Sequence, residues 1–269
     1  RDAFDRATSV YLVDKVVPML PKRLSNGLCS LHPDVDRLTL SVDMEITPSG
    51  DVVRHEIYES VIRSKYRMIY TDVSDLLEGK AAPETVEKYS ELLPTLKVFE
   101  ALAAILRKRR MDRGAIDFNF AEGKVITDDE GRAIDVILDE RRVANRMIEE
   151  FMLIANETVA EHYNRLDFPF VFRIHEDPDE EKIDTFLKYL YNLGVKVKIG
   201  KEGIEPKVVQ QILAQIEGHK EEHVVNKLML RSLKQAKYSP TNEGHFGLAA
   251  EYYCPFTSPI RRYPDLQIH

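Results

Sequence analysis

The sequence is poor in the residues that form disulfide frameworks, zinc sites and membrane spans. It contains two cysteines, Cys29 and Cys254, which stand in neither a CxxC pair nor a zinc-ligand spacing. Such usage is typical of a reducing compartment. No apolar run approaches the ~18 residues of a membrane-spanning helix, and no signal peptide opens the chain. We therefore expect a cytoplasmic protein without membrane contact, unless a signal precedes the first residue.

An excess of positive charge is also missing, since the formal net charge at pH 7 is −7. This charge argues against a generally basic coat for nucleic acid, so an RNA-binding interpretation needs local basic patches such as those of a channel. The sequence also has no glycine-rich phosphate loop and no Ser-His-Asp order. At 269 residues, of which 43% are hydrophobic, the chain can bury the core of one large domain.

The order of apolar and polar residues predicts an α+β fold. Residues 38–46 alternate between the two kinds and predict a half-buried strand, which Thr47–Gly50 turns back into a second strand at Val52–Ile62. Further strands are expected within Gly114–Val136 and at Phe170–His175. Helices are expected at Val73–Leu77, Pro83–Arg110 with an interruption at Pro94, Arg142–Tyr163, Glu180–Leu193, Pro206–Ile216 and His223–Tyr238. No linker composition divides the chain.

Two adjacent arginines near the end of the chain, Arg261 and Arg262, are candidates for binding phosphate. Prolines at 259 and 264 stiffen the backbone on both sides of them. The guanidinium group is a rigid fork of donors suited to phosphate, and the ring of Tyr263 could stack on a base. The alternative is structural, with an ion pair between an arginine and the nearby Asp265 closing a loop.

The string around these arginines, F-T-S-P-I-R-R-Y-P-D-L, is similar to a signature of the RNase II / RNase R family of processive 3′-to-5′ exoribonucleases, within their catalytic RNB domain. Further blocks resemble this family in the family's order and are closer to its RNase R branch. They are residues 9–31, 67–73, 148–157, 172–176, 229–238 and 244–248. One departure is Pro255, where the family pattern leads us to expect a histidine.

The resemblance implies hydrolysis of single-stranded RNA to nucleoside 5′-monophosphates with Mg²⁺ as cofactor. It implies that Arg261 is catalytic and stabilises charge on the attacked phosphate, and that Tyr70 stacks near the 3′-terminal nucleotide. The family's magnesium-binding aspartates precede the Ser9–Leu31 block, and an OB-type RNA-binding domain follows its RNB domain. We therefore expect residues 1–269 to be an incomplete RNB domain without its own metal ligands, monomeric, and inactive as a nuclease by itself.

Two further predictions have structural alternatives. Lys227, Arg231 and Lys234 are spaced i, i+4 and i+7 on the last expected helix, where they would track an RNA backbone or form an ordinary solvated face. Tyr70 would be a stacking ring or a half-buried core residue. For the whole chain, the alternative is a non-catalytic RNA-binding or protein-interaction module derived from the RNB fold. An RNA-binding module would keep salt-sensitive RNA affinity without hydrolysis, and an interaction module would lose both.

Overall fold

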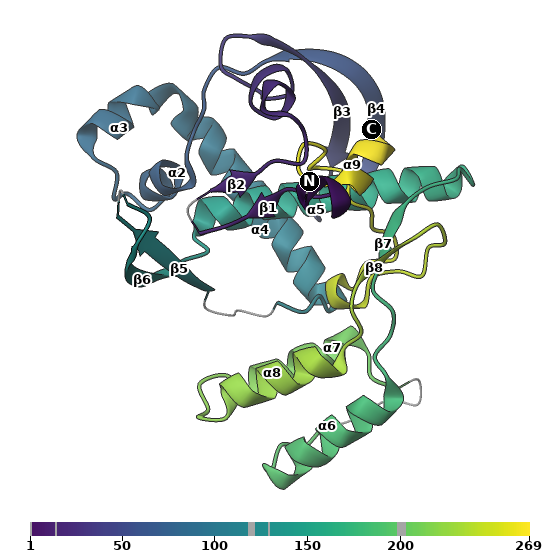
Figure 1. Cartoon of the computed structure of the whole chain (residues 1–269). Coiled ribbons are helices and arrows are strands. Elements are labelled where there is room, and N and C mark those ends of the chain that lie inside the picture. Colours follow the sequence, from purple (N-terminus) through teal and green to yellow (C-terminus); the bar gives the residue numbers. More distant parts are fainter. Residues whose placement is uncertain (1, 14, 118–121, 129, 198–202) are drawn as a thin grey trace. The chain divides into compact units, whose positions relative to one another are not determined.

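The computed structural model describes residues 2–13, 15–117, 122–128, 130–197 and 203–269 (Figure 1). The chain forms two compact units, each with its own buried core. The first unit comprises residues 1–106, 120–156 and 255–269, and the second comprises residues 107–119 and 157–254. Two of the boundaries fall inside long helices, α4 (Leu93–Arg113) and α5 (Val143–Arg165), which explains why no linker composition marks them.

The predicted hairpin is the most regular part of the first unit. Strand β3 (Asp36–Ile46) pairs antiparallel with β4 (Val52–Arg63), and the register shifts once between Glu45 and Ile46, beside the turn. Gly50 has φ 87°, a left-handed conformation that glycine adopts without strain, and its N–H donates to the carbonyl of Thr47 at 2.8 Å. The alternation and the turn residues therefore predicted this hairpin correctly.

Helices α2 (Tyr70–Leu77), α3 (Pro83–Lys88), α4 and α5 supply the core of the first unit. Pro94 does not interrupt a helix, because α4 begins at Leu93 and the missing N–H of Pro94 falls in its first turn. The break lies just before it, at the 3₁₀ turn Ser90–Leu92. The buried core side chains are Val73, Leu76, Tyr89, Leu96, Ala103, Ala144 and Met147.

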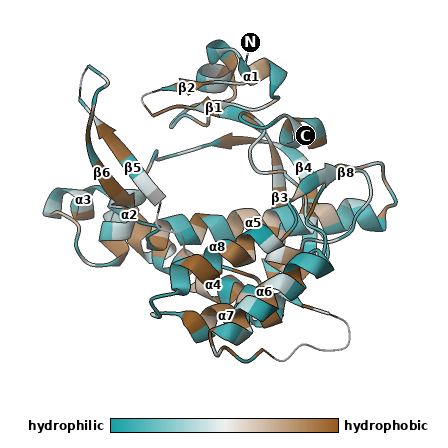
Figure 2. Ribbon diagram, turned by 60° about the horizontal axis from the view of Figure 1, so that its bottom comes forward, coloured by the Kyte–Doolittle hydropathy of each residue, from teal (hydrophilic) through white to brown (hydrophobic). Residues whose placement is uncertain are grey.

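Smaller elements complete the first unit. Strands β1 (Val10–Tyr11) and β2 (Val16–Val17) form a short antiparallel pair, and the chain ends carry helices α1 (Asp2–Asp5) and α9 (Tyr263–Ile268). A π-helical turn spans Leu24–Leu28. Strands β5 (Glu122–Thr127) and β6 (Ala133–Asp139) form the hairpin expected within Gly114–Val136, although residues 118–121 and Asp129 of that range lie outside the described residues. Figure 2 shows apolar residues along β6.

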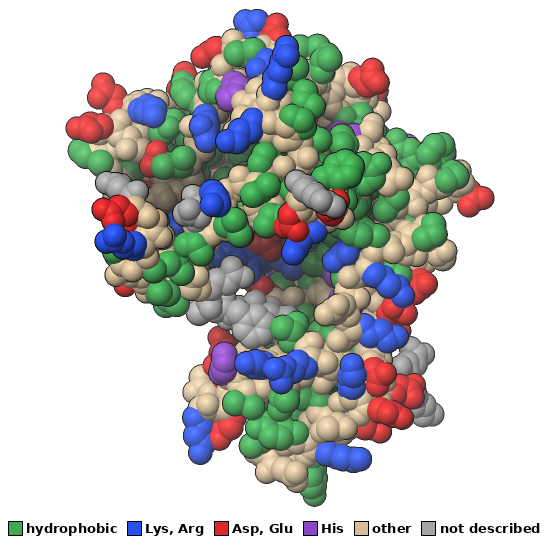
Figure 3. Space-filling view, viewed as in Figure 1, with side chains coloured by type: hydrophobic (Ala, Val, Ile, Leu, Met, Phe, Trp, Pro, Cys, Tyr) green, Lys and Arg blue, Asp and Glu red, His purple; other side chains and the backbone are tan. Residues whose placement is uncertain are grey.

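Charges of both signs are interspersed over the face drawn in Figure 3. Basic side chains do not form a continuous coat on that face. Among the residues that the structure describes, no helix is both long enough and apolar enough to cross a membrane.

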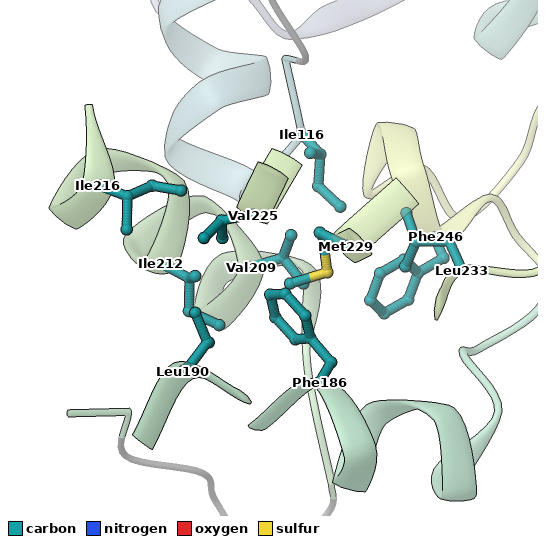
Figure 4. Close-up of a cluster of buried hydrophobic side chains, with 10 residues drawn as sticks. All are labelled: Ile116, Phe186, Leu190, Val209, Ile212, Ile216, Val225, Met229, Leu233 and Phe246. Carbon is teal, nitrogen blue, oxygen red and sulfur yellow. The ribbon is translucent and has the colours of Figure 1, made fainter. Parts of the chain in front are cut away.

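The second unit packs helices α6 (Glu180–Asn192), α7 (Pro206–Ile216) and α8 (Glu222–Ser232) against one another. Asp179 caps α6 by accepting a hydrogen bond from the N–H of Lys182 at 3.2 Å. Side chains of the three helices point into a common core (Figure 4). This core comprises Ile116, Phe186, Leu190, Val209, Ile212, Ile216, Val225, Met229, Leu233 and Phe246.

The prediction of a helix over His223–Tyr238 was wrong at its C-terminal end. Helix α8 ends at Ser232, and Lys237–Ser239 form strand β8, which pairs antiparallel with β7 (Phe172–Ile174). A 3₁₀ turn at Phe246–Leu248 follows. Helices, short antiparallel sheets and these turns together confirm the α+β fold class.

Candidate active site

The turn that carries Arg261 and Arg262 is fixed by backbone hydrogen bonds within the first unit. The carbonyl of Ser258 accepts from the N–H groups of Arg261 at 3.2 Å and Arg262 at 3.1 Å. The carbonyl of Arg261 in turn accepts from the N–H of Ser9 at 2.9 Å and from the hydroxyl of Thr8 at 3.0 Å. Because both backbone groups of Arg261 are engaged, its side chain projects from an immobilised base.

The two adjacent arginines make different contacts. A terminal nitrogen of Arg262 donates to Oδ1 of Asp265 at 2.6 Å, and the same oxygen accepts from the N–H of Ser258 at 2.8 Å. The Asp265 side chain is fully buried. The ion pair that the sequence offered as the structural alternative is therefore formed, and Arg262 is the arginine that forms it. Contact between Arg262 and RNA stays a prediction.

Arg261 instead faces a cavity of about 360 Å³ that several segments of the first unit line. Arg261 and Arg67 are both exposed, and neither has a hydrogen-bonded or ion-paired side chain among the described residues. We call this space the arginine cavity. Its lining residues, within the part of the chain that the structure describes, are Ser9, Tyr11, Val16, Pro18, Ser25, Asn26, Ser30, Leu31, His32, Arg67, Ile260 and Arg261, and no carboxylate is among these described residues. Two guanidinium groups among the described lining residues give this cavity positive charge, which favours an anionic ligand.

The polar wall of the arginine cavity is held in place by Arg37 from β3. Its Nε donates to the carbonyl of Ser30 at 2.9 Å, and a terminal nitrogen donates to the carbonyl of Gly27 at 3.3 Å. Nε2 of His32 lies 2.8 Å from the carbonyl of Asn26. These contacts hold the segment from Leu24 to His32 against β3 without any contribution from a ligand.

The two predicted stacking rings lie in the first unit but do not line the arginine cavity. Tyr70 is the first residue of α2 and is 51% exposed, so it is not a core residue. Tyr263 is the first residue of α9 and is 52% exposed, while its N–H donates to the carbonyl of Ala7 at 3.0 Å. Both residues are about half exposed, and their contact with RNA stays a prediction.

The predicted basic stripe of the second unit is only partly on a helix. Lys227 and Arg231 share a face of α8 and are exposed, but Lys234 lies beyond the end of the helix at Ser232. The Lys234 ammonium is 3.6 Å from Glu176, whose other oxygen accepts from Lys237 at 2.6 Å. The hydrogen bond from Lys237 lowers the pKa of Glu176 below its usual range. The prediction of a three-residue stripe on one helix is therefore wrong, and the RNA contacts of these residues stay predictions.

The described residues do not fit a magnesium site. Within the described ranges, no group of three or more His, Cys, Asp or Glu side chains is placed to hold a metal ion. Glu149 is hydrogen-bonded to Arg141 at 2.8 and 3.0 Å, and Glu157 to Arg113 at 2.8 and 3.0 Å, so these carboxylates are engaged by arginines.

Comparison with known proteins gives the family of this chain. The family model described as "RNB domain" matches residues 1–269. This chain belongs to the RNB family. The RNB chain is 46% identical over 269 residues to ribonuclease R 1 of Lactococcus lactis, covering 100% of the chain and 33% of that protein. It is 47% identical over 272 residues to ribonuclease R of Thermotoga maritima, covering 100% of the chain and 38% of that protein. The RNB chain thus spans about a third of the length of these relatives, and the resemblance to the RNase R branch is confirmed.

Solved structures agree with this family. The structure of Mycoplasma genitalium RNase R in complex with double-stranded RNA superimposes with a TM-score of 0.92 at 30% identity, covering 99% of the RNB chain and 47% of that chain. The complex of the same enzyme with ribose-methylated single-stranded RNA has a TM-score of 0.91 at 30% identity, with 99% and 41% covered. Yeast Ssd1, described as a pseudonuclease, has a TM-score of 0.73 at 20% identity over 99% of the RNB chain and 32% of its own, which shows the fold alone.

Sequence reasoning missed Arg67 and Thr8 in this RNB domain. Arg67 opens the block from which Tyr70 was selected, and Thr8 directly precedes the first family block. The order of the blocks could suggest a common site, but it could not show that residues 9–31, 67 and 260–261 line one cavity. One feature of the sequence could have identified Arg67. It lies inside a family block, and no Asp or Glu stands three or four residues away from it to form an ion pair.

Proposed function

We propose that the protein is an exoribonuclease that degrades single-stranded RNA processively from its 3′ end to nucleoside 5′-monophosphates. The observation that carries the proposal is the Arg261 guanidinium, which has no side-chain partner among the described residues, lies on a hydrogen-bonded turn and lines the arginine cavity together with Arg67. Membership of the RNB family and relatives named ribonuclease R support it. We also propose a monomeric protein in the cytoplasm, on the grounds given by the sequence.

In this proposal Arg261 stabilises the transition state of phosphodiester hydrolysis. Attack of water on phosphorus concentrates negative charge on the non-bridging oxygens, and a guanidinium fork donates two hydrogen bonds to such oxygens. Because the carbonyl and N–H of Arg261 are already engaged, little reorganisation is needed when that charge develops. Removing one fixed donor of this kind typically lowers the rate by on the order of 10²–10³-fold.

Tyr70 is proposed to hold the 3′-terminal nucleotide by stacking. Tyr70 is 51% exposed at the start of α2, and stacking contributes about 1–3 kcal/mol per base without regard to base identity. Such a contact suits an enzyme that must accept every nucleotide in turn. Lys227 and Arg231, both exposed on α8, are proposed to contact phosphates elsewhere along the RNA.

Magnesium is proposed as the cofactor, held by the aspartate block that the family carries ahead of the Ser9–Leu31 segment. Since the described residues do not fit the metal, no step of the reaction is assigned to it here. Bound magnesium would supply a charge that polarises the attacked phosphate. The 269-residue chain by itself is then expected to be inactive, and an EDTA-sensitive 3′-to-5′ product ladder from it would contradict this assignment.

The test is the change of Arg261 to Ala in the natural protein at its full length. With 5′-end-labelled single-stranded RNA and Mg²⁺, we expect kcat to fall 100-fold or more while the Kd for RNA changes little. Arg54→Ala is the matched control, because Arg54 is exposed on β4 and does not line the arginine cavity. Equal losses in binding and turnover would make Arg261 a phosphate-binding residue only. If the parent bound RNA in a salt-sensitive way but gave no product ladder, it would be an RNA-binding module. If the parent neither bound nor hydrolysed RNA, it would be a protein-interaction module.

A further inference from the structure

Helix α2, which begins at Tyr70, is too short to be stable without tertiary contacts. A helix of eight residues is marginal in water, so its stability comes from contacts with the rest of the fold. At its N-terminus, Ile69 makes no side-chain capping hydrogen bond. The position of the Tyr70 ring therefore depends on contacts that are made further along the helix.

Two kinds of contact join the middle of α2 to the start of α5. Val73 and Leu76 of α2 are buried in the same core as Ala144 and Met147 of α5. The buried hydroxyl of Ser74 accepts a hydrogen bond at 3.3 Å from the N–H of Ala144, an amide of the first helical turn that has no partner within its own helix. Burial of apolar side chains is not directional, so it does not by itself fix the rotation of a short helix about its axis.

Arg142, the residue immediately before α5, holds the C-terminal half of α2. One of its terminal nitrogens donates to Asp75 at 2.6 Å and to Glu78 at 3.0 Å, and its Nε donates to the other oxygen of Glu78 at 3.3 Å. The two carboxylates are three positions apart and therefore share a face of the helix. A rigid guanidinium fork that bonds both of them fixes the rotation of α2 as well as its distance from α5. We call this contact the Arg142 clamp.

Both sides of the Arg142 clamp keep their charge near neutral pH. The hydrogen bonds that Arg142 and Lys80 donate lower the pKa of Glu78 to about 2. In turn, the hydrogen bonds to Glu78 and Asp75 raise the pKa of Arg142 above its usual range. The clamp is therefore formed in the folded protein under the conditions in which an enzyme is assayed, and salt is the condition that weakens it.

We propose that Arg142 is a positioning residue that holds α2 in place and thereby fixes the Tyr70 ring for stacking on the 3′-terminal nucleotide. This inference rests on the proposed function and adds a residue that acts without contacting the RNA. Loss of the clamp leaves the buried residues of α2 in place and lets the helix move about them, so the ring loses its fixed orientation. Arg142 should therefore affect how well the last nucleotides are retained, and not the chemical step, which is assigned to the Arg261 turn.

Amide hydrogen exchange of the full-length natural protein tests the clamp without RNA. In Arg142→Gln, which has neither the charge nor the fork, the amides of residues 73–78 should exchange at least about 5-fold faster than in the parent. Arg142→Lys keeps the charge but lacks the fork, and its exchange should fall between the two. Arg63→Gln is the matched control, because it breaks an ion pair of the same unit, with Asp36 at 2.7 Å, that does not involve α2. Equal exchange of residues 73–78 in Arg142→Gln and Arg63→Gln would overturn the proposal.

The lengths of the final products test the link to Tyr70. With 5′-end-labelled oligoadenylate and Mg²⁺, Arg142→Gln should shift these lengths in the same direction as Tyr70→Ala, while kcat on long RNA stays within about 2-fold of the parent. A purely structural role would lower the number of active molecules and leave the product lengths unchanged. Adding Arg142→Gln to Tyr70→Ala should cause no further shift, because both changes act through one ring. Parental products from Arg142→Gln, or a further shift in the double variant, would refute the link.

These outcomes separate the role of Arg142 from the proposed function. If the parent degrades RNA and Tyr70→Ala alters its products while Arg142→Gln does not, only the role of Arg142 is wrong. If the parent gives no product ladder, the proposed function is wrong, and the exchange of residues 73–78 still decides whether Arg142 holds α2.

Discussion

Acid should destabilise the second unit through two partly buried histidines that hold its 3₁₀ turn. Nδ1 of His245 accepts a hydrogen bond from the N–H of Leu248 at 3.2 Å, and Nδ1 of His175 accepts from the N–H of Gly247 at 3.1 Å. The two rings meet edge to face with centroids 5.1 Å apart. Protonation of either Nδ1 would remove an acceptor and place a charge in a desolvated position, so the folded unit requires both imidazoles to be neutral.

The magnitude follows from the pKa of His245. Burial, reinforced by the neighbouring His175, lowers this pKa from 6.5 to about 3. A histidine whose pKa is lower in the folded state contributes stability that is present above pH 6.5 and is lost as the pH falls toward 3, since only the unfolded chain gains the proton in that window. Between pH 7.5 and pH 5.0 the loss is about 2 kcal/mol for His245 alone. Burial also lowers the pKa of His175, which adds loss in the same direction.

Urea unfolding of the 269-residue chain at the two pH values measures this loss, and the variant His245→Asn isolates the part that His245 contributes. Asn cannot titrate there, and its Oδ1 can accept the hydrogen bond of Leu248 as Nδ1 does. The parent should lose about 2 kcal/mol more than His245→Asn between pH 7.5 and 5.0. The control His223→Asn removes an exposed imidazole from α8 of the same unit and should follow the parent. Equal pH dependence of the parent and His245→Asn would refute the reasoning.

Three further predictions concern the first unit. Arg262→Ala should lower the free energy of unfolding in urea by about 3 kcal/mol or more, because it leaves the buried Asp265 carboxylate unpaired. Arg261→Ala should lower it by less than about 0.5 kcal/mol. Equal losses would contradict the different roles of the two arginines. Thr8→Val removes the hydroxyl that donates to the carbonyl of Arg261, so kcat of the full-length protein should fall up to about 10-fold at unchanged KM. Thr8→Ser keeps the hydroxyl and should restore kcat. A fall in kcat that Thr8→Ser does not restore would contradict this positioning role. Tyr70→Ala should make the full-length protein release products at altered lengths, while Tyr70→Phe should resemble the parent. Equal impairment of both variants would show that the hydroxyl, and not stacking of the ring, is required.

Local sequence features predicted the elements whose hydrogen bonds are local. The β3–β4 hairpin is encoded by its own alternation and by the turn at Thr47–Gly50, and α7 was predicted with its observed bounds because Pro206 marks its first turn. Strand β8 was missed because its partners are residues 172–174, more than sixty positions earlier in the chain. The segment after Ser232 keeps a helix-compatible composition, so only pairing with a distant strand explains where α8 ends.

Arg261 and Arg262 are neighbours of the same residue type, yet the sequence does not show which tertiary contacts each of them makes. The sequence named both arginines and also offered an ion pair with Asp265, but it could not say which arginine forms that pair. The backbone at Arg262 is extended, with φ −134° and ψ 127°, whereas Arg261 belongs to the turn whose N–H groups donate to the carbonyl of Ser258. Asp265 is buried in the first turn of α9 and engages Arg262, so Arg261 is left to face the cavity. A buried carboxylate three residues downstream therefore determines which of two identical neighbours is free to meet a phosphate.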